Sequence, residues 1–389
     1  MSDVVLAVNA GSSTLKYALY PVHEGLADAP IFSGQAEVSG DAAFEAALAA
    51  LRDQITPHLP AGSQLVAVAH RIVHGGDRFS ASVRLDDAIV EQLAALNPLA
   101  PLHQPHNLRG VRAFRQAFPG LPQIGCFDTG FHATLPDVER RLPIPQSLHA
   151  EGVRRYGFHG LSYRYLVDSL GARLGTGVPR GRWLMAHLGS GASLAAVQDG
   201  LSVATTMGFS ALDGLMMGTR CGSIDAGVLL HLLRQGWSAE RIEKMLYKDC
   251  GLAGVSGLSN DMRVLRSRAA DHEGAALAIR LFTRRVVREA GALVACLGGL
   301  DGMVFTGGIG EHDVQLRADV SAALAHLGVR IDPAANAGAT GSEIRPIHPN
   351  GDQGRVQVWV VPTDEGRIAA RDAAQLLATL RADSTSTCR

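Results

Sequence analysis

Residues 4–20, VVLAVNAGSSTLKYALY, place the polar segment 9–14 between two apolar runs. Residues 4–8 are continuous, apolar and rich in valine, which predicts a strand buried on both faces. Residues 15–20 are expected to form its hairpin partner. The polar segment is then either an ordinary turn or a phosphate-binding loop between two strands.

A second stretch has the same form. Residues 186–200, AHLGSGASLAAVQDG, again give an apolar strand, a polar residue, a Gly-Ser turn and another apolar strand. One such hairpin is weak evidence, because turn chemistry alone explains it. Two hairpins predict a duplicated domain, whose copies face a shared cleft and present N–H groups and hydroxyls to a polyphosphate. The phosphate-binding interpretation is therefore favoured.

The composition is that of an ordinary globular protein. The chain has 389 residues, of which 47% are hydrophobic and 19% charged, so two domains are expected. The net charge of −1, without long runs of one sign, argues against nucleic acid or a membrane as partner. The five cysteines form no CxxC pair, and no leader or membrane-spanning stretch is evident. We expect a cytoplasmic protein.

Periodicity predicts the remaining elements of an α/β fold. Apolar residues spaced for one helix face occur at 44, 48, 51 and 55, and again along 279–297. A helix is also expected from the glycine turn at 307–310 to about residue 327, and another from the last strand to about residue 380, followed by a frayed polar tail. The expected strands are 65–69, 123–127, 183–187, 192–197, 303–306 and 356–361.

Familiar nucleotide motifs are absent, since the sequence contains neither GxxxxGK[ST] nor a completed GxGxxG. Other islands occur instead. In chain order they are NAGSS-LKY, HRIVHGGDRF, LAPLHQPHN, FDTGFHATLP, RRYGFHGLS, MAHLGSGAS, GLMMGTRCGSID, GLSNDMR, FTGGIGEH and VVPTDE. Together, from residue 5 to about 372, they resemble the acetate kinase family.

The resemblance implies a fold and an activity. The family belongs to the acetate and sugar kinase, heat-shock protein 70 and actin superfamily, in which two ribonuclease H-like domains close on ATP. It implies domains at 1–131 plus 367–389 and at 132–366, and a homodimer. The implied reaction is the reversible, direct in-line phosphorylation of acetate, or another short-chain carboxylate, by ATP with Mg²⁺ (Mn²⁺ possible), giving ADP and acetyl phosphate.

Transfer to a carboxylate requires an acceptor site and positive groups around the moving phosphoryl group, because the acceptor is already an anion. Arg71 follows a predicted strand, where a guanidinium can bind a carboxylate with two hydrogen bonds; a surface ion pair is the alternative. The resemblance makes Arg71 a substrate-binding arginine. It makes Arg220, which lies among small residues, the second active-site arginine, suited to stabilising the transferring group.

Asp128 ends the strand QIGCFD, a place where α/β proteins position functional groups, although a turn aspartate explains it equally well. The resemblance makes it the active-site acid that orients substrate or aids proton handling. His159 lies between Phe158 and Gly160. A lone histidine is usually structural, but the resemblance assigns His159 to transition-state stabilisation through hydrogen bonding.

The resemblance also implies metal and nucleotide residues. Asn9 would hold the metal or its water, and Lys16 would lie near the phosphates. Glu365 is the other metal candidate, since Mg²⁺ needs few protein ligands; a first-turn charge on the helix dipole is its alternative role. The other ATP-site candidates are Ser12, Thr14, His187, Leu188, Gly189, Ser190, Gly191, Asp261, Met262, Arg263, Gly308, Ile309, Gly310, Glu311 and His312.

Some positions depart from the family pattern. Ser190 and His312 stand where asparagine is usual, so we expect altered nucleotide contacts but retained binding. Ala211 stands where proline usually lines the acyl pocket, and Val73 should line the same pocket. The smaller side chain predicts that propionate is accepted well, since a fitting methylene contributes on the order of 1 kcal/mol.

Two alternatives follow. A propionate or butyrate kinase would share the catalytic set and differ only in the pocket. A non-catalytic nucleotide-binding switch would share the fold but would not need an acceptor site, so the presence of the two arginines, the aspartate and the histidine argues against it.

Overall fold

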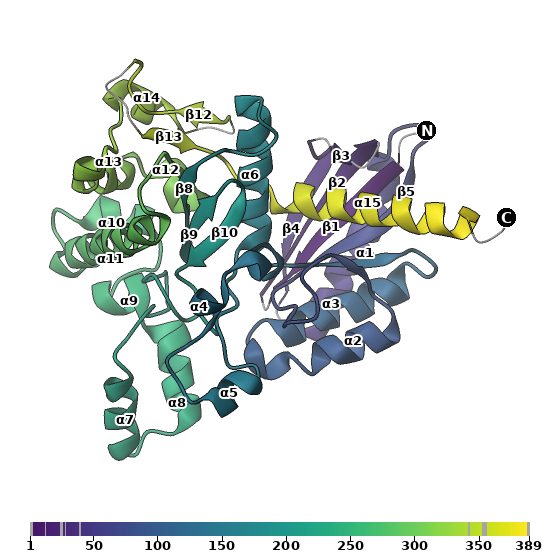
Figure 1. The fold of residues 1–389 in the computed structure, drawn as a ribbon. Helices are drawn as coiled ribbons and strands as arrows, with labels where there is room; N and C mark the ends of the chain where they lie inside the picture. The colour runs from purple at the N-terminus through teal and green to yellow at the C-terminus, as the bar shows by residue number, and fades with distance from the viewer. Residues whose placement is uncertain are drawn as a thin grey trace. The chain divides into compact units, whose positions relative to one another are not determined.

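The computed structural model describes residues 3–11, 13–23, 26–27, 29–38, 40–340, 343–351 and 356–386. Candidate residue Ser12 lies outside them. The chain divides into two compact units: unit 1 contains 1–133, 160–165 and 364–389, and unit 2 contains 134–159 and 166–363. Figure 1 follows the chain through both units. The domain limits implied by the resemblance remain a prediction.

Unit 1 is built on a mixed sheet with the strand order β3-β2-β1-β5-β7-β6, in which β4 also pairs with β2. Strands β1 and β2 form the predicted antiparallel hairpin, while β1, β5 and β7 run parallel. The strands are β1 (Asp3–Ala10), β2 (Thr14–His23), β3 (Leu26–Ala27), β4 (Phe32–Glu37), β5 (Gln64–Ile72), β6 (Val83–Arg84) and β7 (Gln123–Phe127).

Helices cover both faces of this sheet. Alternate β1 residues Val4 and Leu6 pack in a cluster with side chains of α1 and α3, while Val5 and Ala7 pack in a cluster with α15. This alternation explains the continuous apolar run at the start of the chain, because each face of β1 is buried under a different helix. The helices of unit 1 are α1 (Asp41–His58), α2 (Asp87–Ala94), η1 (Asn97–Leu99), α3 (Gln104–Ala117) and α15 (Glu365–Ser386).

Unit 2 repeats this topology. Its sheet has the order β10-β9-β8-β11-β13-β12, with an antiparallel β8–β9 hairpin followed by β11 and β13 parallel to β8. The predicted duplication is therefore confirmed at the level of topology. The strands are β8 (Arg182–Leu188), β9 (Ala192–Gln198), β10 (Leu201–Thr205), β11 (Gly302–Thr306), β12 (Arg345–Pro346) and β13 (Gln357–Val360).

The predicted long helix of unit 2 is α11 (Glu273–Leu297), whose buried face includes Ile279, Phe282 and Val286 as expected. In the described ranges, no helix is long and apolar enough to cross a membrane. The other helices from residue 130 to 338 are η2 (Gly130–Thr134), α4 (Asp137–Arg140), α5 (Gln146–Ala150), α6 (Gly160–Leu174), α7 (Ala226–Arg234), α8 (Ala239–Lys244), η3 (Met245–Asp249), α9 (Gly251–Ser256), α10 (Met262–Arg268), α12 (Gly307–His312), α13 (Val314–Ala323), η4 (Ala325–Leu327) and α14 (Pro333–Gly338).

Two helix predictions were wrong in extent. The segment after β11 is not one helix to residue 327: it breaks at Asp313, whose side chain accepts a hydrogen bond from Leu316 N and starts α13. Because α12 has only six residues, its dipole offers a weaker phosphate site than a long helix would. The tail expected to fray continues α15 to Ser386, since no glycine or proline follows Gly366 to stop it.

Candidate active site

The substrate-binding candidate Arg71 and the catalytic candidate Asp128 meet at the carboxyl ends of neighbouring parallel strands of unit 1. Arg71 lies opposite Cys126 in the β5–β7 register, and Asp128 directly follows β7. Arg71 Nε donates to Asp128 Oδ1 at 2.9 Å, and Arg71 Nη2 donates to Oδ2 at 2.5 Å. This two-point geometry fixes the guanidinium plane, as in the strongest carboxylate–arginine pairs.

Glu365 completes a charged triad with this pair. It is the first residue of α15, and its Oε2 lies 3.2 Å from Arg71 Nε. Burial raises the pKa of Asp128 to about 6; Arg71 opposes this rise and Glu365 adds to it. Burial alone would lower the pKa of Arg71, but the two carboxylates outweigh it and raise that pKa. The triad therefore places two carboxylate groups against one guanidinium.

A cavity of about 170 Å³ in unit 1 opens beside this triad. Its lining includes Asn9 and Lys16 from the first hairpin together with Arg71 and Glu365. One amide and one carboxylate oxygen fit Mg²⁺, which keeps most of its waters and takes few protein ligands. Over the described ranges, no group of three or more His, Cys, Asp or Glu residues could hold a metal. Asn9 and Glu365 could therefore give two oxygen ligands to a metal ion bound to a polyphosphate.

In unit 2 the candidate histidine His159 has an unusual backbone. It precedes α6 with φ 59°, in the left-handed region that residues other than glycine seldom adopt and that recurs at functional sites. Its Nδ1 lies 2.8 Å from Ser193 Oγ, and its ring stacks on His187 with 4.3 Å between centroids. Since Ser193 engages Nδ1, the ring presents Nε2 to its other neighbours.

Gly191, in the turn of the second hairpin, is where His159 and Arg220 converge. A Cβ placed on Gly191 would lie 2.6 Å from Arg220 Nη2 and 3.1 Å from His159 Nε2. Arg220 is itself held, because its Nη1 donates to the Ala211 carbonyl at 2.7 Å. The Gly191 backbone, the Arg220 guanidinium and the His159 imidazole thus lie together at the turn of the second hairpin. This arrangement is suited to binding an anion.

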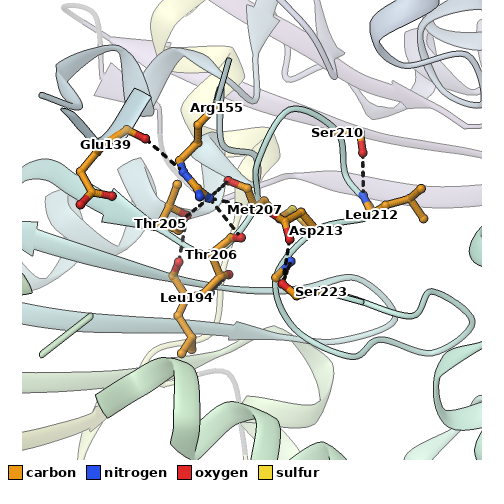
Figure 2. A network of polar contacts seen from close by, with 11 residues as sticks. Glu139, Arg155, Leu194, Thr205, Thr206, Met207, Ser210, Leu212, Asp213 and Ser223 are labelled. Atoms are coloured by element: carbon orange, nitrogen blue, oxygen red, sulfur yellow. Dashed lines mark hydrogen bonds and ion pairs between the residues drawn. The ribbon is translucent and has the colours of Figure 1, made fainter. Parts of the chain in front are cut away.

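Arg155, which was not among the predicted site residues, holds the segment 205–207 that leads to Ala211. Arg155 Nη1 donates to the carbonyls of Thr205 and Met207 at 3.0 and 3.1 Å, and to that of Thr206 at 3.4 Å. Figure 2 shows this fan of contacts and the nearby Asp213, which accepts a hydrogen bond from Ser223. The signal in the sequence was only that Arg155 lies in the RRYGFHG island.

The nucleotide-site candidates near residue 261 differ in exposure. The side chain of Asp261 caps α10 by accepting from Arg263 N, and it also pairs with the Arg263 guanidinium. Arg263 is 89% exposed, whereas Met262 is 4% exposed and belongs to the core. Met262 can therefore contribute little more than backbone to a ligand.

In the glycine segment after β11, Glu311 turns its carboxylate inward. Its Oε1 accepts hydrogen bonds from Gly307 N at 2.9 Å and from Thr363 N at 3.1 Å, which fixes the start of α12. The Cα of Gly308 faces open space, since a Cβ there would have nothing within 4 Å, and His312 is 55% exposed. Gly308 and His312 are thus accessible to a ligand, whereas the Glu311 carboxylate serves the loop itself.

Arg317 supports the same segment from behind. Its side chain is fully buried, and it donates to the carbonyls of Gly310 and Glu311 at 2.9 and 2.7 Å. It also donates to Asn336 and to the Ala339 carbonyl. A buried guanidinium with five neutral acceptors fixes the C-terminal end of α12, and sequence reasoning missed it because nothing local marks it.

The structure thus brings the candidates together in two groups, one in each unit. In unit 1 they are Asn9, Lys16, Arg71, Asp128 and Glu365, and Thr14 lies in the same hairpin, accepting from Gly11 N through its carbonyl. Val73 is not among the residues that line the cavity beside them; it is 6% exposed and its amide donates to Asn107 Oδ1.

In unit 2, His159, His187 and Arg220 surround the 188–191 turn. Leu188 is buried, and the Ser190 carbonyl accepts from Gly218 N at 3.1 Å. Gly189 lies in the turn between β8 and β9, whereas Ile309 and Gly310 lie in α12, the helix expected after β11. Ser193, which orients His159, was missed although it lies within the repeated hairpin.

Comparison with known proteins shows which family the chain belongs to. Residues 4–371 match the Acetokinase family. An acetate kinase of Rhodopseudomonas palustris is 46% identical over 394 residues, covering 95% of this chain and 98% of the relative.

Two solved structures are similar over almost the whole chain. An acetate kinase of Porphyromonas gingivalis has a TM-score of 0.85 and 35% identity, covering 96% of this chain and all of that one. A propionate kinase of Francisella tularensis has a TM-score of 0.84 and 34% identity, covering 95% of this chain and 98% of that one. The two repeated sheets and the charged residues at their strand ends are therefore those of a protein that belongs to the acetokinase family.

Proposed function

We propose that this chain is an acetate kinase, which transfers the γ-phosphoryl group of ATP directly to acetate and releases ADP and acetyl phosphate. The observation that carries the proposal is the pair of fixed guanidinium groups. Arg71 in unit 1 and Arg220 in unit 2 are each oriented by hydrogen bonds beside the hairpin of their unit. Two preorganised cations suit a reaction between two anions.

The roles follow from the chemistry of each group. Arg71 binds the acceptor carboxylate, and Asp128 holds the Arg71 guanidinium in the plane needed for two-point binding. Arg220 and the Nε2 of His159 donate to the equatorial oxygens of the transferring group over the bare backbone of Gly191. No strong base is required, because the acceptor is ionised at neutral pH.

Asn9 and Glu365 would hold Mg²⁺ or Mn²⁺ arriving with ATP, with Lys16 near the phosphates. The ion supplies charge neutralisation on the polyphosphate. The adenosine side is assigned to Asp261, Arg263, Gly308 and His312. Exclusion of water from the site would prevent water from accepting the phosphoryl group in place of acetate.

Acetate is proposed as the main acceptor, and propionate as the alternative. The alternative is favoured by Ala211, a small residue whose carbonyl positions Arg220. We expect Ala211→Pro to lower kcat/KM for propionate about tenfold relative to acetate, within the range that one methylene commands. An unchanged ratio would remove Ala211 from the acyl pocket.

We propose a homodimer joined through α7. Every residue of this helix is at least partly exposed, and Val228, Leu230 and Leu233 are 39%, 53% and 48% exposed. An apolar helix in this state is typical of a surface covered by a partner. This interface would be supported if the wild type sediments as a dimer and Leu230→Glu sediments as a monomer. It would be contradicted if both proteins sediment as monomers.

A cytoplasmic location is proposed because the described cysteines Cys126, Cys221, Cys250 and Cys296 are all free, as is usual in a reducing compartment.

The test of the function is acid-dependent ADP release. Wild-type protein should release ADP from ATP only when acetate or propionate is present. Arg220→Ala should lose this acid-dependent release of ADP but still bind ATP. Slow ATP hydrolysis that ignores acetate would instead identify a nucleotide-binding switch.

A further inference from the structure

A tyrosine at the far end of the first hairpin contacts the start of α15. Tyr20 lies in β2 opposite Val5 and is 3% exposed. Its hydroxyl donates to Asp364 Oδ1 at 2.6 Å, across 344 residues of sequence. A buried hydroxyl is thereby committed to the residue that immediately precedes Glu365.

Asp364 in turn fixes the first turn of α15. The oxygen that accepts from Tyr20 also accepts from Arg367 N at 3.0 Å, which is the hydrogen bond of a helix N-cap. Gly366 makes room for the tyrosine, since a Cβ there would lie 2.5 Å from the Tyr20 hydroxyl. The direction in which α15 begins is therefore set by the β2 strand.

The residue aimed by this arrangement is Glu365. Its carboxylate lies 3.2 Å from Arg71 Nε and lines the same cavity as Asn9, Lys16 and Tyr20. Since the helix start is held at Asp364, the adjacent Glu365 is held toward Arg71 and Asn9. Burial and the Asp364 charge raise the pKa of Tyr20, so the hydroxyl remains a donor at every pH of interest.

We propose that Tyr20 and Asp364 are positioning residues for the metal–nucleotide complex: Tyr20 holds Asp364, Asp364 caps α15, and the cap aims Glu365 at the divalent ion. This inference rests on the proposed function, because it takes Glu365 as a ligand of the metal or its water. Glu365 would then present its carboxylate in the binding orientation before the ion arrives, so that binding requires no rearrangement of this ligand.

The variants separate positioning from simple loss of stability. Tyr20→Phe removes the hydroxyl but keeps the ring, and Asp364→Ala removes the cap. Asp364→Asn keeps an oxygen that can accept from both Tyr20 and Arg367 N, so it should behave as the conservative rescue. Asp86→Ala is the matched control, because Asp86 caps α2 in the same unit by accepting from Ile89 N at 2.8 Å, away from the cavity.

The readout is the affinity for ADP with and without Mn²⁺, measured by calorimetry, together with Mn²⁺ binding followed by electron paramagnetic resonance in the presence of ADP. We expect Tyr20→Phe and Asp364→Ala to weaken the Mn²⁺-dependent part of ADP binding about tenfold, while metal-free ADP affinity stays at the wild-type value. Asp364→Asn and Asp86→Ala should keep the wild-type Mn²⁺ dependence, although Asp86→Ala lowers the melting temperature about as much as Asp364→Ala.

Each other outcome is informative. Wild-type Mn²⁺ dependence in Tyr20→Phe and Asp364→Ala would overturn the positioning role, as would equal losses in Asp86→Ala. If wild-type protein itself forms no acyl phosphate, the proposed function fails, and this is seen before any variant is compared.

Discussion

Adding one methyl group at Gly191 tests the catalytic arrangement of unit 2 directly. The Cβ of Gly191→Ala would lie 2.6 Å from Arg220 Nη2 and 3.1 Å from His159 Nε2. Both atoms are ends of side chains rather than backbone, and Gly191 is not among the glycines with positive φ. The protein should therefore fold, with Arg220 displaced by about 1 Å to restore a normal contact distance.

A displacement of about 1 Å in a positioned catalytic group costs about 100-fold in rate, which corresponds to about 2.7 kcal/mol of transition-state stabilisation. We expect Gly191→Ala to lose this factor in kcat/KM for acyl phosphate formation, while its melting temperature stays within a few degrees of wild type. The matched control is Gly291→Ala in α11, where a Cβ has nothing within 4 Å. That variant should keep full activity and gain up to about 1 kcal/mol in stability. Gly191→Ala activity within threefold of wild type, in a folded protein, would refute the convergence of His159 and Arg220 on this turn.

Two further predictions concern stability. Burial lowers the pKa of His70 from 6.5 to about 4 in the folded protein. As the pH falls below 6.5, His70 therefore binds a proton in the unfolded chain before it does so in the folded protein. The free energy of unfolding decreases over this range. The loss between pH 7 and pH 5 is about 2 kcal/mol, and urea unfolding of His70→Gln should show a pH dependence flatter by that amount; parallel curves would contradict it. Arg317→Met leaves buried carbonyls of Gly310 and Ala339 without their donor, at about 1–3 kcal/mol for each group. It should lower both the free energy of unfolding and the ATP affinity, and a variant with wild-type ATP affinity would show that Arg317 does not support the α12 segment.

Local signals predicted the framework well. The run 4–8 and the strand 123–127 were recognised because strands buried in a parallel sheet are mostly apolar. The repeat of the hairpin predicted the duplicated topology, since each copy opens its own sheet. These features are determined by residues that are close together in the sequence, so one sequence is enough to predict them.

Contacts between distant segments could not be predicted in the same way. The two-point pairing of Arg71 with Asp128 depends on the β5–β7 register, and the Tyr20–Asp364 hydrogen bond joins the two ends of the chain. Sequence suggested that Arg71 and Asp128 act on substrate, but not that they hold each other. The break at Asp313 was missed because an aspartate inside a helical pattern signals an N-cap only when its side chain reaches Leu316 N.

Trapping of the product with hydroxylamine shows whether the protein transfers a phosphoryl group directly to a carboxylate. Purified protein is incubated with Mg-ATP and hydroxylamine, and with acetate, propionate, butyrate or no acid. Hydroxamate that forms only with acid, with acetate or propionate preferred, is the predicted result. ATP binding without hydroxamate from any of the three acids would contradict the account, leaving the fold in place without the chemistry.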